Sequence, residues 1–385
     1  MFDPQEITAS SFTAVEDETR LALLRSQLDY ARQSSSFYRA HLADAPLPDS
    51  LEALSALPLM DAETLRAAGR QAVCVDAGAV ARIVSLHTSG STGDAKRLYF
   101  TEGDLGRTAE FFAEGMAWMC APGDRVAVLM PCGSPDGIGD LLCRALRSIG
   151  VEPLAIGIPQ DYAAVGQQLL EARPAVLVGF PWHVRLLALR CPTLRPRAVL
   201  LSGDYTPAGL PPLVQSLWGC RVLNHFGMTE TGYGCAVEHP CGSVMYLRRD
   251  ELIAEVIDPE SGAVLPAGTE GELVLTTLRR EAMPLIRYRT GDLAVLDERG
   301  DLLAVHGRRS AAPGFYETQD ALSALPWLFD YRIADGILTA ELSLDAPDDA
   351  AARLLAASGA AACVPERSAP AQARAFDLGK RTLVT

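Results

Sequence analysis

The sequence predicts an α/β protein: a large N-terminal domain with mostly parallel βαβ sheets and a small antiparallel β subdomain, followed by a small mobile α+β C-terminal domain. Between about residues 121 and 227, apolar strands alternate with helical segments, which is typical of parallel βαβ units. From residue 252, short strands broken by Gly-rich turns indicate antiparallel pairing. A chain of 385 residues is long enough for more than one packed unit. We expect domains over 1–308 and 309–385, the second acting as a lid.

The individual elements follow from spacing and turn residues. Leu21, Leu24 and Leu28 recur at helical spacing, which predicts a helix over 13–45. Asp61 is expected to cap a short helix that follows it. A strand at 79–86 and a helix at 104–120 come next, followed by a turn and a short buried strand within 122–131. The alternating pattern then predicts helices at 139–150, 162–172, 182–190 and 211–219, with strands at 151–158, 174–180, 197–204 and 220–227. In a parallel sheet, ligands bind beyond the carboxyl ends of the strands, where the segments SGD and HFGMTE fall.

Composition limits the kind of partner. The formal charge is -14 and the isoelectric point is near 4.9, which argues against nucleic acid and against an anionic membrane surface. Nine cysteines, an odd number without regular spacing, favour a reducing cytoplasmic location over a disulfide framework. The N-terminus lacks the basic and apolar regions of a signal peptide, and no apolar run approaches the roughly 20 residues of a membrane span.

The segment TSGSTGDAK, residues 88–96, has the chemistry of a phosphate-binding loop. Gly90 and Gly93 allow the backbone N–H groups to approach an anion closely. Hydroxyl donors come from Thr88, Ser89, Ser91 and Thr92, and Lys96 adds a positive charge. The spacing differs from that of a Walker loop.

Three further motifs follow along the chain. HFGMTETG offers an aromatic face in Phe226, a hydroxyl in Thr229 and a carboxylate in Glu230, which can ligate Mg²⁺. RYRTGDL places Asp292 on a predicted Gly turn between strands, where its carboxylate can accept hydrogen bonds from ribose hydroxyls. GRRS places Arg308 after a glycine and is uninformative alone.

Together these motifs resemble the adenylate-forming superfamily of acyl-CoA synthetases, in order and in approximate spacing. The segments YARQSSSFYRAHL, LPLMDAETL and PLIRYRTGDL resemble its phenylacetate–CoA ligase-like branch. The resemblance covers nearly the whole chain.

The resemblance implies a role for each matching residue. The loop residues and Lys96 would hold the phosphates of ATP, and Glu230 would bind Mg²⁺. Thr229 would bond the α-phosphate, and Lys380, in a late Gly-Lys motif, would reach the carboxylate during adenylation. The remaining nucleotide contacts implied by the resemblance are Ser202, Gly203, Asp204, Phe226, Gly227, Asp292 and Arg308.

The implied reaction is ATP-dependent activation of a carboxylic acid, aromatic or small, to an acyl-adenylate with release of pyrophosphate. Thioester formation with CoA would follow. Two alternatives stay open: transfer to the thiol of an acyl carrier protein or another protein, and a non-catalytic nucleotide-binding protein. The expected partners are the acid and CoA or the carrier protein, with a homodimer left open.

Three regions depart from the family pattern or are hard to interpret. After Arg308 the chain lacks the acidic pair and second Arg-Gly of the family hinge, which puts the second half-reaction in doubt. Cys235, His239 and Cys241 could hold a structural Zn²⁺, although ordinary turn residues are the favoured interpretation. Trp182, Tyr205 and His225 are candidates for the acid pocket, or for packed core.

Overall fold

The computed structural model describes residues 15–86, 95–242 and 244–368. Contacts between residues divide the chain into two compact units, each of which combines two separate stretches of sequence. Unit 1 consists of the described residues up to Trp118 together with His225–Arg309. Unit 2 consists of Met119–Asn224 together with the described residues from Ser310. The predicted boundary at 308/309 lies one residue from the third crossing of the chain between the units, at 309/310. Whether 309–385 is an independent lid domain stays a prediction.

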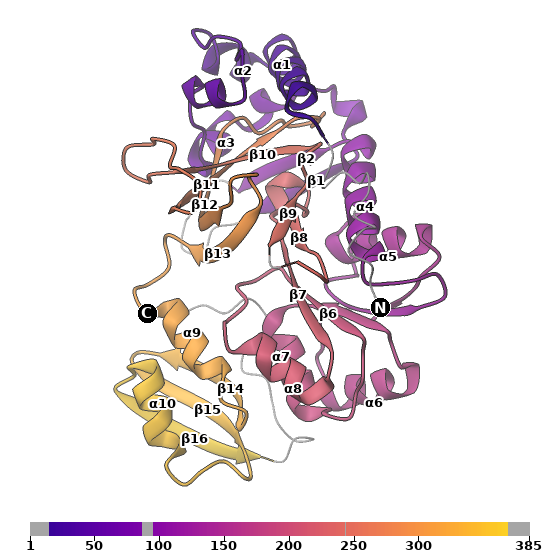
Figure 1. The fold of residues 1–385 in the computed structure, drawn as a ribbon, viewed down its shortest axis with the longest axis vertical. Coiled ribbons are helices and arrows are strands. Elements are labelled where there is room, and N and C mark those ends of the chain that lie inside the picture. Colours follow the sequence, from indigo (N-terminus) through magenta and orange to yellow (C-terminus); the bar gives the residue numbers. More distant parts are fainter. Residues whose placement is uncertain (1–14, 87–94, 243, 369–385) are drawn as a thin grey trace. The chain divides into compact units, whose positions relative to one another are not determined.

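Unit 1 contains four α-helices and an antiparallel sheet (Figure 1). Its α-helices are α1 (Asp17–Ser34), α2 (Ser36–His41), α3 (Ala62–Ala68) and α4 (Glu102–Ala117), and its 3₁₀ helices are η2 (Glu52–Ala56), η3 (Gly69–Ala72), η4 (Ala77–Ala79) and η5 (Thr229–Thr231). Its strands are β1 (Arg82–Leu86), β2 (Lys96–Phe100), β8 (Ala236–Glu238), β9 (Met245–Leu247), β10 (Leu252–Ile257), β11 (Glu270–Thr277), β12 (Tyr288–Leu296) and β13 (Leu302–Arg308).

The unit 1 strands pair in antiparallel fashion. Strands β10, β11, β12, β13, β9 and β8 are neighbours in that order, and β1 pairs with β2 as a separate ribbon. The last two residues of β7 (Arg221–Phe226), His225 and Phe226, pair with Val237 and Ala236 of β8. The ribbon β1–β2 brackets the Gly- and hydroxyl-rich segment of the sequence, so the chain enters and leaves that segment on paired strands.

A buried carboxylate connects α4 to the segment before β12. Asp104 is 2% exposed, and its side chain accepts hydrogen bonds from the backbone N–H groups of Thr101, Glu281 and Ala282. The Thr101 side chain in turn accepts from the Asp104 N–H, which completes a capping box at the helix start. Burial by itself would raise the pKa of Asp104, but the nearby Arg280 charge and the three N–H donors lower it.

Unit 2 contains a parallel sheet and a small mixed sheet (Figure 1). The parallel sheet has the order β6 (Ala198–Ser202), β5 (Val176–Gly179), β3 (Arg125–Leu129), β4 (Glu152–Ala155). In the small sheet, β15 (Ile337–Ser343) lies between its antiparallel neighbour β14 (Leu328–Ala334) and its parallel neighbour β16 (Ala362–Ser368). The helices are α5 (Ile138–Ser148), α6 (Tyr162–Ala172), α7 (Pro181–Arg190), α8 (Leu210–Trp218), α9 (Phe315–Ser323) and α10 (Ala350–Ser358).

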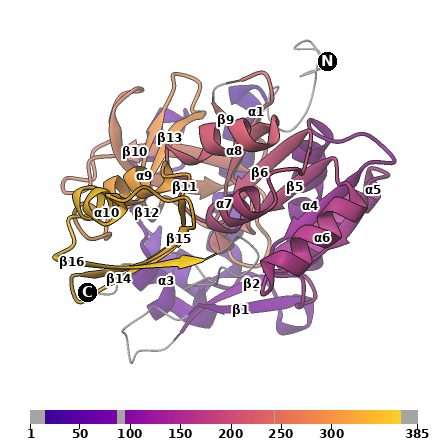
Figure 2. The same cartoon turned by 90° about the horizontal axis from the view of Figure 1, so that it is seen from below.

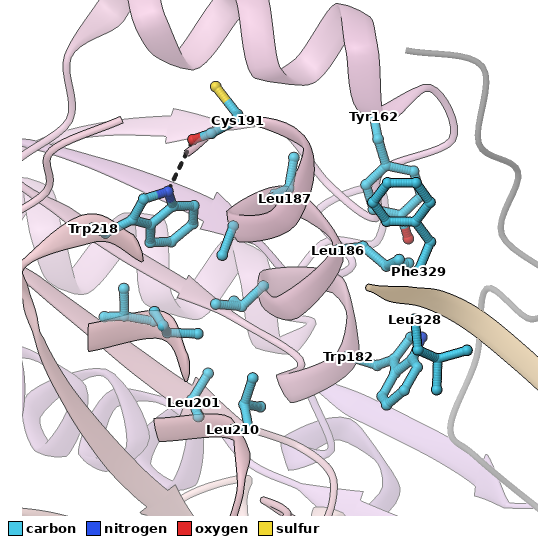
Figure 3. Packing of buried hydrophobic residues seen from close by; sticks show 14 of the residues in the cluster. Tyr162, Trp182, Leu186, Leu187, Cys191, Leu201, Leu210, Trp218, Leu328 and Phe329 are labelled. Atoms are coloured by element: carbon cyan, nitrogen blue, oxygen red, sulfur yellow. Dashed lines mark hydrogen bonds between the residues drawn. The ribbon is translucent and has the colours of Figure 1, made fainter. Parts of the chain in front are cut away.

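One hydrophobic core joins the two stretches of unit 2. It combines residues from 127–222 with residues from 322–354. Helices α7 and α8 lie side by side (Figures 1 and 2) and contribute Leu187 and Trp218, whose indole N–H donates to the carbonyl of Cys191 (Figure 3). Leu328 and Phe329 of β14 pack into the same cluster.

Buried polar contacts also hold the two stretches of unit 2 together. Arg185 of α7 is fully buried and donates hydrogen bonds to backbone carbonyls of the later stretch: Ser323 (3.0 Å), Leu325 (2.7 Å), Leu328 (2.7 Å) and Phe329 (3.3 Å). Trp182 donates to Asp330 at 2.8 Å. The segment 322–354 is therefore built into the interior of unit 2.

The predicted α/β class is confirmed, with parallel strands in the alternating region and antiparallel strands between 252 and 308. The predicted helix at 13–45 is shorter and divided in two, because Ser35 has an extended backbone and caps α2. Helix α9 was not predicted. Among the described residues, no helix is long and apolar enough to cross a membrane.

Candidate functional site

Two predicted site residues of unit 1, Lys96 and Glu230, form a buried polar cluster with Tyr288, which was not predicted. We call these three residues the Lys96 cluster. The Lys96 ammonium forms an ion pair with Oε1 of Glu230 and donates to the Tyr288 hydroxyl at 3.1 Å. The Tyr288 hydroxyl donates to the same Glu230 oxygen at 3.4 Å. The side chains of Lys96 and Glu230 are 12% and 8% exposed, so the pair is largely shielded from water.

Each member of the Lys96 cluster comes from a different element. Lys96 is the first residue of β2, directly after the Gly- and hydroxyl-rich segment. Glu230 lies in the short helix η5, just beyond the end of β7. Tyr288 is the first residue of β12 and is 1% exposed. The fold therefore brings together a cation and a carboxylate that are 134 residues apart in the sequence.

The Tyr288 hydroxyl stays protonated at neutral pH. Burial raises the pKa of this phenol well above its usual range, and the negative charge of Glu230 raises it further. The side chain can therefore act as a hydrogen-bond donor and acceptor at once.

Asp292 and Arg308 lie on paired strands. Asp292 in β12 is 6% exposed and pairs in register with Arg308 at the end of β13. The Arg308 Nε lies 3.1 Å from an Asp292 carboxylate oxygen, and one terminal N–H donates to the Thr290 carbonyl at 2.6 Å. The expected Gly turn is wrong in detail: Gly291 has a positive φ of 77°, but it lies inside β12, where the pairing with β11 is irregular.

Aromatic side chains surround the end of β7. The rings of Phe111 and Phe112 lie 5.8 and 5.9 Å from the His225 ring. Burial lowers the pKa of His225 to about 4, so this ring is neutral at neutral pH. Gly227 follows Phe226, and a Cβ added there would lie 1.9 Å from the Tyr233 carbonyl oxygen. Only glycine fits at that position.

Other candidates lie in unit 2. Ser202 ends β6, and Gly203 has a φ of 86°, with the Phe180 ring 2.5 Å from the position of an added Cβ. The Asp204 side chain accepts a hydrogen bond from the backbone N–H of Tyr205 at 2.8 Å. The chain thus turns tightly at Gly203, directly after the strand, and contact of this segment with nucleotide stays a prediction.

Two of the pocket candidates have partners within unit 2. Trp182 is 5% exposed and packs edge-on against Tyr331 in the core. The Tyr205 hydroxyl donates to the Asp320 carboxylate at 3.0 Å, and its ring lies 4.5 Å from that of Tyr316. Their place in an acid pocket stays a prediction.

Several expected residues lie outside the described part of the chain: Thr88, Ser89, Gly90, Ser91, Thr92, Gly93 and Lys380.

Within the described part, no group of three His, Cys, Asp or Glu side chains is arranged to hold a metal ion. Cys235 instead contacts the Thr231 hydroxyl at 3.0 Å, while the backbone N–H of Cys241 donates to the His239 ring at 3.1 Å. Thr229 is partly exposed in η5.

Sequence reasoning did not assign a role to Tyr288, although the residue opens the YRTGDL motif. A signal was available in strand periodicity. Alternate residues of a strand share a face, so Tyr288, Thr290 and Asp292 lie on one face of β12. All three are buried, at 1%, 4% and 6% exposure.

The parallel strands of unit 2, the hydroxyl-rich sequence that leads to Lys96 and the buried Glu230 are typical of α/β proteins of the nucleotide-binding class. The sequence profile of the family described as AMP-binding enzyme matches residues 14–278. The chain belongs to this family.

Curated relatives confirm the resemblance to the phenylacetate–CoA ligase-like branch. The phenylacetate-coenzyme A ligase of Thermus thermophilus is 32% identical over 229 residues, which cover 54% of this chain and 49% of that enzyme. The enzyme of the same name from Pseudomonas putida is 28% identical over 317 residues, covering 77% of this chain and 69% of that enzyme. The chain thus spans about half the length of the Thermus relative.

A solved structure confirms the fold. The crystal structure of 2-hydroxyisobutyryl-CoA ligase in the postadenylation state matches with a TM-score of 0.77, covering 96% of this chain and 89% of that one. At 21% identity, this likeness concerns the fold alone.

Proposed function

We propose that the protein uses ATP to convert a carboxylic acid to an acyl-adenylate, releases pyrophosphate, and then transfers the acyl group to CoA. The observation that carries the proposal is the Lys96 cluster, in which a lysine that follows a hydroxyl-rich segment meets a buried carboxylate. Membership of the AMP-binding enzyme family and the phenylacetate–CoA ligase relatives support the same reaction.

Glu230 offers a carboxylate ligand of the kind that suits a magnesium ion. Glu230 is a buried carboxylate that is neutralised here by an ammonium group, and carboxylate oxygen is the ligand type that Mg²⁺ prefers. Glu230 would hold the ion, and Mg²⁺ would supply positive charge beside the phosphates of ATP. Lys96 is attached to a long, flexible stem, so it can exchange a carboxylate partner for a phosphate.

The chemistry of the first step is the approach of two anions. A carboxylate oxygen of the acid attacks the α-phosphorus of ATP, a new C–O–P linkage forms, and the bond to pyrophosphate breaks. Lys96 and the hydroxyl and N–H donors at 88–93 would bind the departing pyrophosphate. Thr229 would donate to the α-phosphate, and the positive charge of Lys380 would balance the negative charge of the acid's carboxylate, as the family resemblance implies. Fixed donors of this kind lower the barrier because they stabilise charge in the transition state.

Asp292 and Arg308 would hold the ribose end of the nucleotide. Asp292 already forms an ion pair with Arg308, which orients its carboxylate. A second carboxylate oxygen of a positioned aspartate can accept from ribose hydroxyls.

An aromatic or small acid that carries no charge besides its carboxylate fits best. The support is the end of β7, where the neutral His225 ring lies 5.8 and 5.9 Å from the rings of Phe111 and Phe112. A neutral aromatic surface favours an apolar acyl group, since desolvating a second charge on the substrate would cost binding energy.

The proposal can be tested by measuring pyrophosphate release from ATP and Mg²⁺ with a panel of aromatic and short aliphatic acids, with and without CoA. We expect acid-dependent release, and CoA-dependent turnover with the same acids. Release of pyrophosphate with accumulation of acyl-adenylate but no response to CoA would favour a carrier-protein thiol as acceptor. Absence of release with every acid would favour a non-catalytic nucleotide-binding protein.

Two matched variants distinguish loss of a site residue from a general loss of stability. Glu230→Gln keeps the size of the side chain and removes its charge, and we expect it to abolish pyrophosphate release. Glu270→Gln changes a half-exposed carboxylate that pairs with His306, and it should leave release unchanged. Equal loss in both variants would contradict the assignment of Glu230.

A further inference from the structure

Tyr288 contacts both charged members of the Lys96 cluster. Its hydroxyl accepts a hydrogen bond from Lys96 and donates one to Glu230. A phenol has one donor hydrogen and two acceptor lone pairs, so both contacts can form together. The Lys96 ammonium also lies 5.7 Å from the centre of the Tyr288 ring, within the range of a cation–π contact.

The backbone holds Tyr288 in place on both sides. The Met60 N–H donates to the carbonyl of Arg287 at 3.0 Å, and the Arg289 N–H donates to the Met60 carbonyl at 2.7 Å. Tyr288 also pairs with Leu275 of β11. Its hydroxyl therefore belongs to a fixed strand, whereas the Lys96 ammonium is carried by a flexible side chain.

The residue before Tyr288, Arg287, has an unusual backbone conformation that its own side-chain contacts stabilise. Arg287 has a φ of 47°, in the left-handed region. Its guanidinium bonds the Glu255 carboxylate at 3.0 Å and the carbonyls of Ser55 and Leu57 at 2.7 and 2.8 Å. These contacts stabilise a backbone geometry that a side chain of this kind rarely adopts, and they set the direction of β12 at Tyr288.

We infer that Tyr288 is a positioning residue, which keeps the Glu230 carboxylate oriented for a divalent cation when Lys96 leaves it for a nucleotide phosphate. This inference rests on the proposed function. It follows from the geometry because Glu230 loses its ammonium partner on that exchange. Within the part of the chain that the structure describes, the fixed hydroxyl of Tyr288 is a second donor to the same carboxylate oxygen.

The test uses the variant Tyr288→Phe, which keeps the ring and removes only the hydroxyl. Binding of ATP is measured by calorimetry without acid, in EDTA and in a series of MgCl₂ concentrations. We expect the affinity for ATP in EDTA to stay within about twofold of the wild type. The strengthening of binding by Mg²⁺ should fall about tenfold, as expected for loss of a hydrogen bond to a charged group.

Tyr38→Phe is the matched control. Tyr38 is also fully buried in unit 1, and its hydroxyl bonds the carbonyl of Pro284, away from the Lys96 cluster. Both variants lose one buried hydroxyl, so a merely structural effect should lower their melting temperatures alike. The Mg²⁺ dependence of ATP binding should change in Tyr288→Phe alone.

A double-mutant cycle with Glu230→Gln checks that Tyr288 acts through Glu230. In the Glu230→Gln background, Tyr288→Phe should have no further effect on the Mg²⁺ dependence. A wild-type Mg²⁺ dependence in Tyr288→Phe, or an equal loss of ATP binding with and without Mg²⁺, would overturn the inference and leave the proposed function standing. Failure of the wild-type protein to bind ATP with Mg²⁺ would overturn both. Should Tyr288→Phe fail to fold, a Glu230→Gln variant that keeps the wild-type Mg²⁺ dependence would equally overturn the inference.

Discussion

Replacing Arg185 with methionine tests whether the segment 322–354 is part of the interior of unit 2. Arg185 donates to four backbone carbonyls of that segment, two of them at 2.7 Å. A hydrogen bond with a charged donor contributes about 1.5–3 kcal/mol, so the two short bonds would contribute ~3–6 kcal/mol. Burying the guanidinium charge costs desolvation free energy, and the methionine variant does not have this cost, which offsets part of the loss in stability. We therefore expect Arg185→Met to lower the free energy of unfolding by about 3 kcal/mol.

Urea unfolding followed by tryptophan fluorescence is a suitable assay, because three of the four tryptophans, Trp182, Trp218 and Trp327, belong to unit 2. The control is Arg195→Met. Arg195 also donates to backbone carbonyls, including that of Leu194 at 2.8 Å, but it is exposed. We expect the control to change the free energy of unfolding by less than about 0.5 kcal/mol. An effect of Arg185→Met below about 1 kcal/mol would refute the reasoning.

Three further predictions concern other parts of the chain. The lowered pKa of Asp104 means that its ionised form stabilises the fold above the unfolded value of about 4. Asp104→Asn should therefore lower the melting temperature at pH 7, and the difference should shrink as pH falls below the unfolded value and through the lowered pKa of the folded state; a pH-independent difference would contradict this. Gly227→Ala should abolish pyrophosphate release and destabilise the protein, whereas Gly78→Ala, in open space, should do neither. The side chain of Cys143 lowers the pKa of Cys132 to about 7, so iodoacetamide should alkylate Cys132 at pH 6.5 and react more slowly in Cys143→Ala, as judged by mass spectrometry.

Much of the local structure could be predicted because it depends on short-range patterns. The helix at Tyr162–Ala172 begins and ends as expected, since Asp161 caps it and the apolar positions repeat at helical spacing. Asp61 caps α3 as predicted. Helix α9 was missed because it follows a Gly- and Pro-containing segment that was interpreted as a shortened hinge; Gly314 begins it with a φ of 77°.

The candidate site was predictable as a set of residue types but not as a set of contacts. Lys96 and Glu230 were both expected near phosphate and metal, yet nothing in their local sequences shows that they pair with each other. Likewise, the partners of Trp182 and Tyr205 are Asp330 and Asp320, which lie 148 and 115 residues further along the chain. Tertiary packing decides which distant partner an aromatic side chain contacts, and local sequence periodicity does not encode that packing.

The shared core of unit 2 has a consequence for the order of folding during synthesis. Leu186 and Leu187 emerge from the ribosome well before Leu328 and Leu338, with which they share one cluster. Until the later residues are made, part of the apolar surface of these leucines stays exposed, and the stretch 225–309, which belongs to unit 1, is synthesised in between. A nascent chain stopped near Arg309 would leave apolar surface and the Arg185 guanidinium without their final partners, and it would be a natural substrate for chaperones.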